Sequence, residues 1–216
     1  MLKGIIEVII FDVDGTLSEE VSWLKLTHGL GASVEKHSQV FADFKAGKLS
    51  YSKAKKRLIK IWQSTGKTNK NFMEHMFESW KLKPDAQETI DYLKNASYKL
   101  CLISGAVDLY VQVVARKLGI KDWYANTTLV WDNNGNLVDV HYHADQAQKK
   151  LDHFHEYNEK FGIDKKKCAV IGDGDSDIVL FRELPYGIAV NKKPYPELEQ
   201  LAYRSVHQLS DLRELF

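Results

Sequence analysis

The chain lacks the features that mark membrane, secreted and nucleic-acid-binding proteins. Its only two cysteines lie in short apolar runs, Cys101 within residues 99–103 and Cys168 within 168–171, so we expect buried free thiols and no disulfide. No apolar stretch is long enough to span a membrane, and Glu7 interrupts the apolar N-terminal segment, so we expect neither a membrane span nor a secretion signal. A formal net charge of +1 provides no general attraction to nucleic acid. These absences favour a cytoplasmic protein without a nucleic-acid or membrane partner.

The chain does contain two clusters of acidic residues, each directly after an apolar run. Their carboxylates belong to Asp12, Asp14, Asp173, Asp175 and Asp177. Short apolar runs that end in Gly and Asp are typical of buried parallel strands, and ligands of open α/β sheets gather at the carboxyl ends of such strands. Five carboxylates in one crevice repel one another unless a cation neutralises them, and Mg²⁺ prefers oxygen ligands. The sequence therefore predicts a magnesium-dependent phosphoryl-transfer site.

The order of the expected elements predicts an α/β fold: a doubly wound, mostly parallel Rossmann-like sheet with a helical cap inserted after the first strand. Residues 5–11 read as the first strand, and the following stretch to residue 82 has the apolar spacing of amphipathic helices. We therefore expect a core domain of residues 1–17 and 83–216 and a cap domain of residues 18–82.

Alternating helices and strands are expected again from Pro84 onward. The expected strands cover residues 98–103, 168–171 and 186–190, and the expected helices cover 84–95, 108–118, 145–161, 175–183 and 195–202. Within this part, an Asn-Gly turn separates residues 127–131 from 137–141 and predicts a β-hairpin, a candidate flap.

The motifs and their order resemble the haloacid dehalogenase superfamily, and within it the phosphoserine-phosphatase-like branch. The resemblance rests on Asp-x-Asp-Gly-Thr starting at Asp12, the helical insert after it, Ile103-Ser104-Gly105, a lysine before the last core strands, and the stretch Gly172–Asp177. It implies a Mg²⁺-dependent phosphatase that hydrolyses small phosphomonoesters through an aspartyl-phosphate intermediate, acting on a small phosphorylated metabolite. The oligomeric state, monomer or homodimer, stays open.

The resemblance also implies roles for four of the acids. Asp12 would be the nucleophile, and Asp14 would protonate the leaving group and then activate water. The metal would be held by the carboxylates of Asp12, Asp173 and Asp177 together with the backbone carbonyl of Asp14. We expect Asp175 to be a solvated acid, and Ser176 stands where many relatives have Asn.

The residues implied in phosphate binding are small or cationic: Gly15, Thr16, Ser104, Gly105 and Lys150. Ser104 would also act in catalysis, because its hydroxyl can stabilise charge on the transferring group. Lys150 precedes Asp173 by 23 residues, a spacing that resembles close relatives. Its neighbour Lys149 remains the alternative.

The predicted cap raises the question of the substrate. Residues 44–73 contain nine basic and no acidic residues, which describes either a basic lid for anionic substrates or a solvated helix face. Phosphoserine-specific relatives hold the amino acid with a Glu and an Arg. A direct count places Val21 at the Glu position, with Glu20 one residue away, and Lys56 and Arg57 stand near the Arg position, again offset by one. Phosphoserine is therefore a candidate substrate. Trp23 is either a core residue or a stacking wall for the substrate.

Two other function classes fit the same motifs. A phosphotransferase would discharge the aspartyl-phosphate onto a second substrate instead of water. A receiver-like or phosphate-sensing module would use the phosphorylated or anion-bound state as a signal. The long cap argues against a minimal receiver, and Asp14 argues against a purely sensory site, because a lasting mark gains nothing from a neighbouring general base.

Overall fold

The structure, a computed structural model, describes residues 2–190 and 195–216. In this part of the chain one sheet runs through the molecule, with the strand order β4-β3-β2-β1-β5-β6-β7. The strands are β1 Val8–Phe11, β2 Lys99–Val107, β3 Asp122–Trp131, β4 Leu137–Tyr142, β5 Cys168–Gly172, β6 Tyr186–Val190 and β7 Arg204–Val206. Neighbouring strands are parallel except β3 and β4, which form an antiparallel hairpin at one edge. The predicted α/β class and mostly parallel sheet are confirmed.

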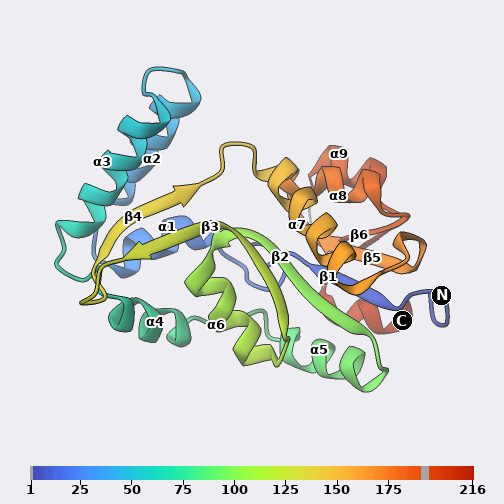
Figure 1. Ribbon diagram of the computed structural model, residues 1–216. Coiled ribbons are helices and arrows are strands. Elements are labelled where there is room, and N and C mark those ends of the chain that lie inside the picture. Colours follow the sequence, from blue (N-terminus) through green and yellow to red (C-terminus); the bar gives the residue numbers. More distant parts are fainter. Residues whose placement is uncertain (1, 191–194) are drawn as a thin grey trace.

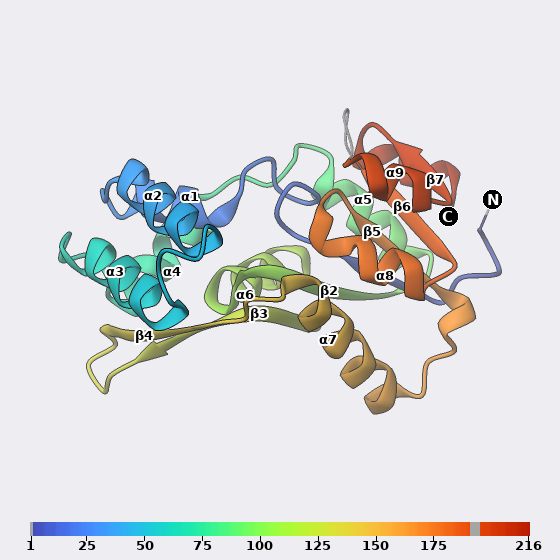
Figure 2. The ribbon, with the colours of Figure 1, turned by 90° about the horizontal axis from the view of Figure 1, so that it is seen from above.

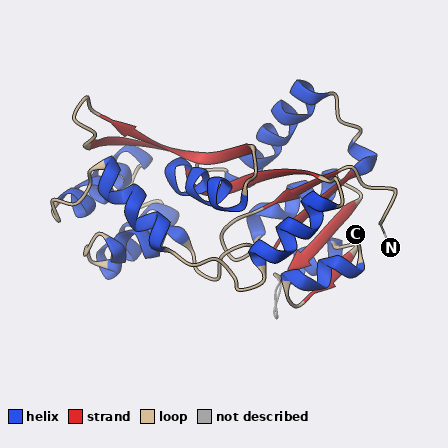
Figure 3. Cartoon of the chain, turned by 90° about the horizontal axis from the view of Figure 1, so that it is seen from below, coloured by secondary structure: helices blue, strands red, loops and turns tan. Residues whose placement is uncertain are grey.

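Helices cover both faces of this sheet (Figure 1, Figure 3). In chain order they are α1 Ser22–Gly29, α2 Val34–Lys45, α3 Tyr51–Gln63, α4 Lys70–Ser79, α5 Ala86–Asn95, α6 Asp108–Leu118, α7 Gln146–Phe161, α8 Ile178–Glu183 and α9 Pro196–Leu201. No helix in the described ranges combines the length and the apolar character needed to cross a membrane.

The central strand β1 is buried on both faces, which explains its uninterrupted apolar sequence. Successive strand side chains point to opposite faces of a sheet. Ile9 and Phe11 therefore pack into one apolar cluster with α5 and α6, whereas Val8 and Ile10 pack into a second cluster with α7 and α8. This two-sided packing is the doubly wound arrangement that the sequence predicts.

Four helices, α1 to α4, form the insert between β1 and β2 and lie together at one end of the molecule (Figure 2). The side chains of Ser33, Ser50 and Asn69 accept backbone N–H groups in the first turns of α2, α3 and α4, and such caps favour helix initiation at these points. Trp62 and Phe77 are fully buried and belong to the same apolar cluster as Ile9 of the sheet. The insert therefore packs against the core.

The β3–β4 hairpin is bonded to this insert through the backbone. The N–H of Lys70 donates to the carbonyl of Gly135 at 2.7 Å, and the N–H of Leu137 donates to the carbonyl of Thr68 at 2.9 Å. Gly135 has a φ of +76°, which the tight turn requires and a side chain would disfavour. The expected hairpin is present, and it supports the cap helices.

Some strand limits were predicted wrongly. β1 begins at Val8 instead of residue 5, and β3 begins at Asp122 because its first residues pair in parallel with β2. β2 continues past residue 103 to Val107, with a register irregularity between Ser104 and Val107. These limits depend on pairing with neighbouring strands, which a local sequence pattern does not contain. The expectation for the cysteines is confirmed, since both are buried and free.

Candidate active site

The two acidic clusters meet because their strands are neighbours. β1 lies between β2 and β5, and Phe11, the last residue of β1, is level with Leu102 and with Ile171. Asp12 follows directly, and its N–H donates to the carbonyl of Ile171 at 3.0 Å. The residues that follow Phe11, Leu102 and Ile171 therefore gather at the carboxyl edge of the sheet.

Three carboxylates lie close together at this edge. One oxygen atom each from Asp12, Asp173 and Asp177 lies within 4.8 Å of the other two. Burial raises the pKa of Asp173 to about 7, and the charges of Asp12 and Asp177 add to the shift. Burial also raises the pKa of Asp177 to about 6. Buried, mutually repelling carboxylate oxygens are a donor set that fits a hard divalent cation.

Lys150 supplies a positive charge to this cluster. Its ammonium lies 3.1 Å from Oδ1 of Asp12 and 2.6 Å from Oδ1 of Asp177, and the side chain is fully buried. Burial alone would disfavour the ammonium, but the two carboxylates outweigh it and raise the pKa of Lys150. Among the ion pairs of the described residues, Lys149 makes none with these acids. Lys150 is thus the lysine that reaches Asp12.

Asp177 also organises the second acidic loop. Its Oδ2 accepts the N–H of Asp173 at 3.2 Å and that of Gly174 at 3.3 Å. The segment Asp175–Asp177 is a single 3₁₀ turn that precedes α8 and was expected as part of a longer helix. This turn keeps the Asp177 side chain beneath the loop that carries Asp173.

Gly15 and Thr16 join the first acidic loop to the second. The Thr16 hydroxyl donates to Oδ1 of Asp173 at 3.0 Å. Gly15 has a φ of +76°, and a Cβ atom there would lie only 2.1 Å from Oδ2 of Asp173. A residue with a side chain would therefore separate the two loops.

Asp14 is attached to the first cap helix. Its Oδ2 accepts the Ser22 N–H at 2.9 Å and the Ser22 hydroxyl at 2.6 Å, while its Oδ1 is buried without a partner. Burial raises the pKa of Asp14 to about 7, although the Ser22 hydrogen bond opposes the shift. A carboxyl group that titrates near neutrality suits both donation and acceptance of a proton. No local pattern pointed to Ser22, which is eight residues from Asp14.

Ser104 and Gly105 lie on β2 beside the N-terminal end of α7. Ser104 is fully buried, and its hydroxyl oxygen accepts the N–H of Ala106 at 3.3 Å. A Cβ atom on Gly105 would lie 2.9 Å from Oε1 of Gln146. The Asn126 amide donates to both the backbone carbonyl and Oε1 of Gln146, at 2.8 Å each. Sequence reasoning missed Asn126, which links β3 to the helix that carries Lys150.

Lys83 is a second lysine at the site that sequence reasoning missed. Its ammonium donates to the carbonyl of Gly15 at 2.6 Å, and its N–H donates to the carbonyl of Leu17 at 2.8 Å. Partial burial lowers the pKa of Lys83, against the opposing charge of Asp173. Lys83 thus connects the chain leaving the cap to the loop that follows Asp12. Its position at the start of the second predicted core segment, directly after the cap, was the only signal available in the sequence.

The predicted substrate-selecting residues of the cap are not all brought to this edge. Glu20 forms an ion pair with Lys25 at the surface, and Lys56 and Arg57 are exposed on α3. Trp23 differs, because its indole N–H donates to the carbonyl of Gly105 at 3.5 Å. Of these cap residues, Trp23 is the one with a described hydrogen bond to β2.

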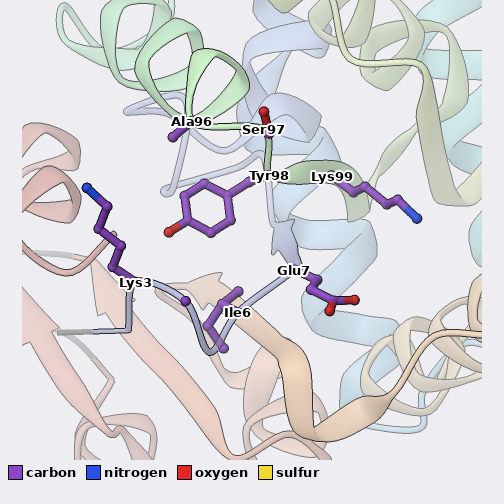
Figure 4. A pocket seen from close by; sticks show the side chains of 8 residues that line it. Lys3, Ile6, Glu7, Ala96, Ser97, Tyr98 and Lys99 are labelled. Atoms are coloured by element: carbon purple, nitrogen blue, oxygen red, sulfur yellow. The ribbon is translucent and has the colours of Figure 1, made fainter.

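A separate hollow lies at the opposite edge of the sheet. It is lined by residues that precede or begin β1 and β2, among them Lys3, Ile6, Glu7, Tyr98 and Lys99. Figure 4 shows the Tyr98 ring directed into it, toward Lys3 and Ile6. Because parallel strands carry their ligands at the carboxyl ends, this hollow is distinct from the acidic site.

Comparisons with known proteins identify a matching family and proteins of similar fold. The model of a family described as haloacid dehalogenase-like hydrolase matches residues 6–184. A phosphoserine phosphatase of Methanocaldococcus jannaschii is 26% identical over 212 residues, which cover 97% of this chain and 95% of that protein. A solved structure of substrate-bound phosphoserine phosphatase has a TM-score of 0.74 at 24% identity and covers 98% of both chains. A HAD family hydrolase from Salmonella enterica serovar Typhi has a TM-score of 0.79 at 20% identity, covering 97% of this chain and 71% of that one.

Proposed function

This chain belongs to the haloacid dehalogenase-like hydrolases, and on that basis we propose that it is a magnesium-dependent phosphatase of small phosphomonoesters. The observation that carries the proposal is the convergence of Asp12, Asp173, Asp177 and Lys150 at one buried edge of the sheet. The physiological partner is then a small phosphorylated metabolite. Similarity to proteins named phosphoserine phosphatase makes phosphoserine the first candidate to test.

The residues suit a reaction in two displacements. An oxygen of Asp12 attacks phosphorus, the bond between phosphorus and the ester oxygen breaks, and Asp14 gives its proton to the departing alkoxide. Asp14 then takes a proton from water as the water oxygen attacks phosphorus, which releases phosphate and restores Asp12. Lys150 and the Ser104 hydroxyl hold the phosphoryl oxygens throughout.

The metal would be held by the carboxylates of Asp12, Asp173 and Asp177 and by the backbone carbonyl of Asp14. Mg²⁺ would neutralise charge between the anionic ester and the anionic nucleophile when bound. The identity of the ion as Mg²⁺ is part of the proposal, supported by the all-oxygen donor set.

Phosphate release from a panel of phosphomonoesters tests this function. Wild type and Asp12→Asn are compared with Mg²⁺ and with EDTA, and phosphoserine is included in the panel. We expect metal-dependent turnover that falls by roughly 10³-fold or more in Asp12→Asn, because the amide is a poor nucleophile. Turnover that survives this substitution would rule out Asp12 as the nucleophile.

The phosphotransferase reading uses the same intermediate and differs only in the acceptor. Product analysis with added alcohols separates transfer from hydrolysis. The raised pKa of Asp14, about 7, supports a group that activates water or an alcohol, and so favours both enzyme readings over a sensing module.

We further propose the division into a cap of residues 18–82 and a core of residues 1–17 and 83–216. Its support is that the two connections lie side by side, with the N–H of Lys83 donating to the carbonyl of Leu17. A cytoplasmic location is likewise a proposal, supported by two buried cysteines that are free thiols.

A further inference from the structure

Three aromatic side chains from separate elements meet between the cap and the hairpin. Trp23 comes from α1, Tyr51 from the start of α3 and Tyr142 from the end of β4 (Figure 1). The Trp23 and Tyr142 rings are 5.7 Å apart in an edge-to-face arrangement, and Tyr51 stacks on Tyr142 at 6.5 Å. Trp23 and Tyr142 are half-buried, and Tyr51 is 37% exposed. We call these three residues the aromatic wall.

The aromatic wall lies beside the reacting groups. The indole N–H of Trp23 donates to the carbonyl of Gly105, the residue after Ser104. Trp23 also directly follows Ser22, whose N–H and hydroxyl hold Asp14. The wall thus lies next to both the phosphate-binding strand and the acid that protonates the leaving group, where the alcohol part of an ester would lie.

Buried contacts behind the wall hold its rings in place. Trp23 stacks on the fully buried Trp62, with ring centres 5.8 Å apart and an angle of 27° between the planes. The Trp62 indole donates to the Thr27 hydroxyl at 2.8 Å. On the other side, the Tyr142 N–H donates to the Tyr51 hydroxyl oxygen at 3.0 Å. Rings that are fixed before binding lose little conformational entropy when a ligand packs on them.

The charged cap residues do not complete a site for an amino acid. The Glu20 carboxylate is paired with Lys25 at the surface, and Val21, beside it, is 56% exposed. Lys56 and Arg57 lie on the exposed face of α3. The carboxylate of an amino acid placed against the aromatic wall would lose hydration without gaining Lys56 or Arg57 as a partner, which costs free energy.

We propose that the enzyme prefers phosphate esters whose alcohol carries a flat, uncharged aromatic ring, which packs on Trp23, Tyr51 and Tyr142. This rests on the proposed phosphatase function and names its substrate class. Aromatic rings gain both apolar burial and favourable ring geometry against such a wall.

The test compares three alkyl phosphates whose chemistry at phosphorus is similar: benzyl phosphate, propyl phosphate and phosphoserine. We expect kcat/KM for benzyl phosphate to exceed that of both other esters by about tenfold or more, mainly through a lower KM, which is the effect of one stacked ring. A higher kcat/KM for phosphoserine than for benzyl phosphate would overturn the inference and leave the phosphatase function intact. Absence of hydrolysis of all three esters would overturn the phosphatase function as well.

Variants then test the wall itself. In Trp23→Leu we expect the ratio of kcat/KM between benzyl and propyl phosphate to fall to about one, because both alcohols then face an aliphatic surface. Trp123→Leu is the matched control, since Trp123 is a partly buried tryptophan of β3 that, among the ring pairs of the described residues, makes none with the wall, and there the ratio should stay at its wild-type value.

Tyr51→Leu provides a second test if Trp23→Leu does not fold, because Tyr51 is 37% exposed and its loss removes little packing. In Tyr51→Leu the ratio of kcat/KM between benzyl and propyl phosphate should also fall. A ratio unchanged in the folded wall variants, or an equal loss of activity on all three esters, would contradict selection by the wall.

Discussion

At the residue scale, the contacts of Lys150 dominate the electrostatics of the site. Among the described residues, the Lys150 ammonium is the cation that pairs with both Asp12 and Asp177, and its side chain is fully buried. Removing one partner from a buried ion pair leaves the remaining charges without compensation. The neighbouring Lys149 has the same chemistry without this contact, and so provides an internal control.

We predict that Lys150→Met lowers the unfolding free energy of the metal-free protein by about 3 kcal/mol and lowers kcat/KM by about 10²-fold or more. Lys149→Met should change the unfolding free energy by less than about 0.5 kcal/mol, because substitutions that break no buried contact usually have effects of that size. Urea unfolding and steady-state kinetics of both variants measure this difference. Equal effects of the two substitutions would show that the buried position of Lys150 has no special role.

Lys83 contacts the loop that follows β1 through the backbone, since it donates to the carbonyl of Gly15. We predict that Lys83→Met raises the Mg²⁺ concentration for half-maximal activity by about tenfold, the usual effect of losing an outer contact of a metal site. Lys83→Arg, which keeps the charge and the donor, should restore part of the affinity.

Lys81→Met is the control for Lys83→Met, because Lys81 is an exposed lysine on the same connection. The Mg²⁺ titration should be unchanged in this control. An unchanged titration in Lys83→Met, with only a lower unfolding temperature, would reduce Lys83 to a structural residue.

At the scale of elements, the hairpin formed by β3 and β4 determines how the cap is supported. Its turn bonds to the start of α4 through Lys70 and Gly135, and Lys55 of α3 pairs with Asp139 of β4 at 2.9 Å. The backbone bonds matter more than the ion pair, because partly exposed ion pairs contribute only about 0–1 kcal/mol. The cap and the hairpin are therefore expected to move as one unit.

Gly135→Ala tests this support. Its φ of +76° is strained for alanine, so we expect a loss of about 1–2 kcal/mol in stability together with a higher KM, because Tyr142 lies on the same hairpin. Gly66→Ala is a matched control with a φ of +70° and no atom within 4 Å of the new Cβ. It should lose similar stability at unchanged KM. If both variants keep the wild-type KM, the hairpin does not position the cap for substrate.

At the scale of the whole molecule, we expect the acidic site to make stability depend on metal and pH together. Burial raises the pKa of Asp173 to about 7 and that of Asp177 to about 6, so the folded protein binds protons there that the unfolded chain, with a usual value near 3.8, does not. In the metal-free protein these groups therefore stabilise the fold at low pH, and that contribution is lost as pH rises through 6 to 7.

We predict that Mg²⁺ raises the unfolding temperature more at pH 8 than at pH 5.5, because protons compete with the metal for the same carboxylates. Thermal unfolding with Mg²⁺ and with EDTA at the two pH values measures this. In Asp173→Asn, the effect of Mg²⁺ on the unfolding temperature should no longer differ between pH 8 and pH 5.5. An equal metal effect at both pH values would contradict binding at the acidic cluster.

Much of the architecture could be read from local patterns. The apolar run before Asp12 predicted a strand buried on both faces, and the helical spacing that follows predicted the insert. The limits of β2 and β3 could not be read, because they depend on pairing between strands that are distant in sequence. The candidate site residues at strand ends could likewise be identified, since their acidic and polar side chains come directly after apolar runs.

The sequence by itself determined the fold class, the acids available for chemistry and their location at strand ends, because periodicity and strand-end motifs are local properties. Only the tertiary structure decided that Lys150 and not Lys149 reaches Asp12, that Ser22 and Lys83 hold the first acidic loop, and that Trp23 meets Tyr142. Adjacent helical residues differ in direction by about 100°, and contacts between distant segments depend on packing. These features therefore follow from the assembled fold.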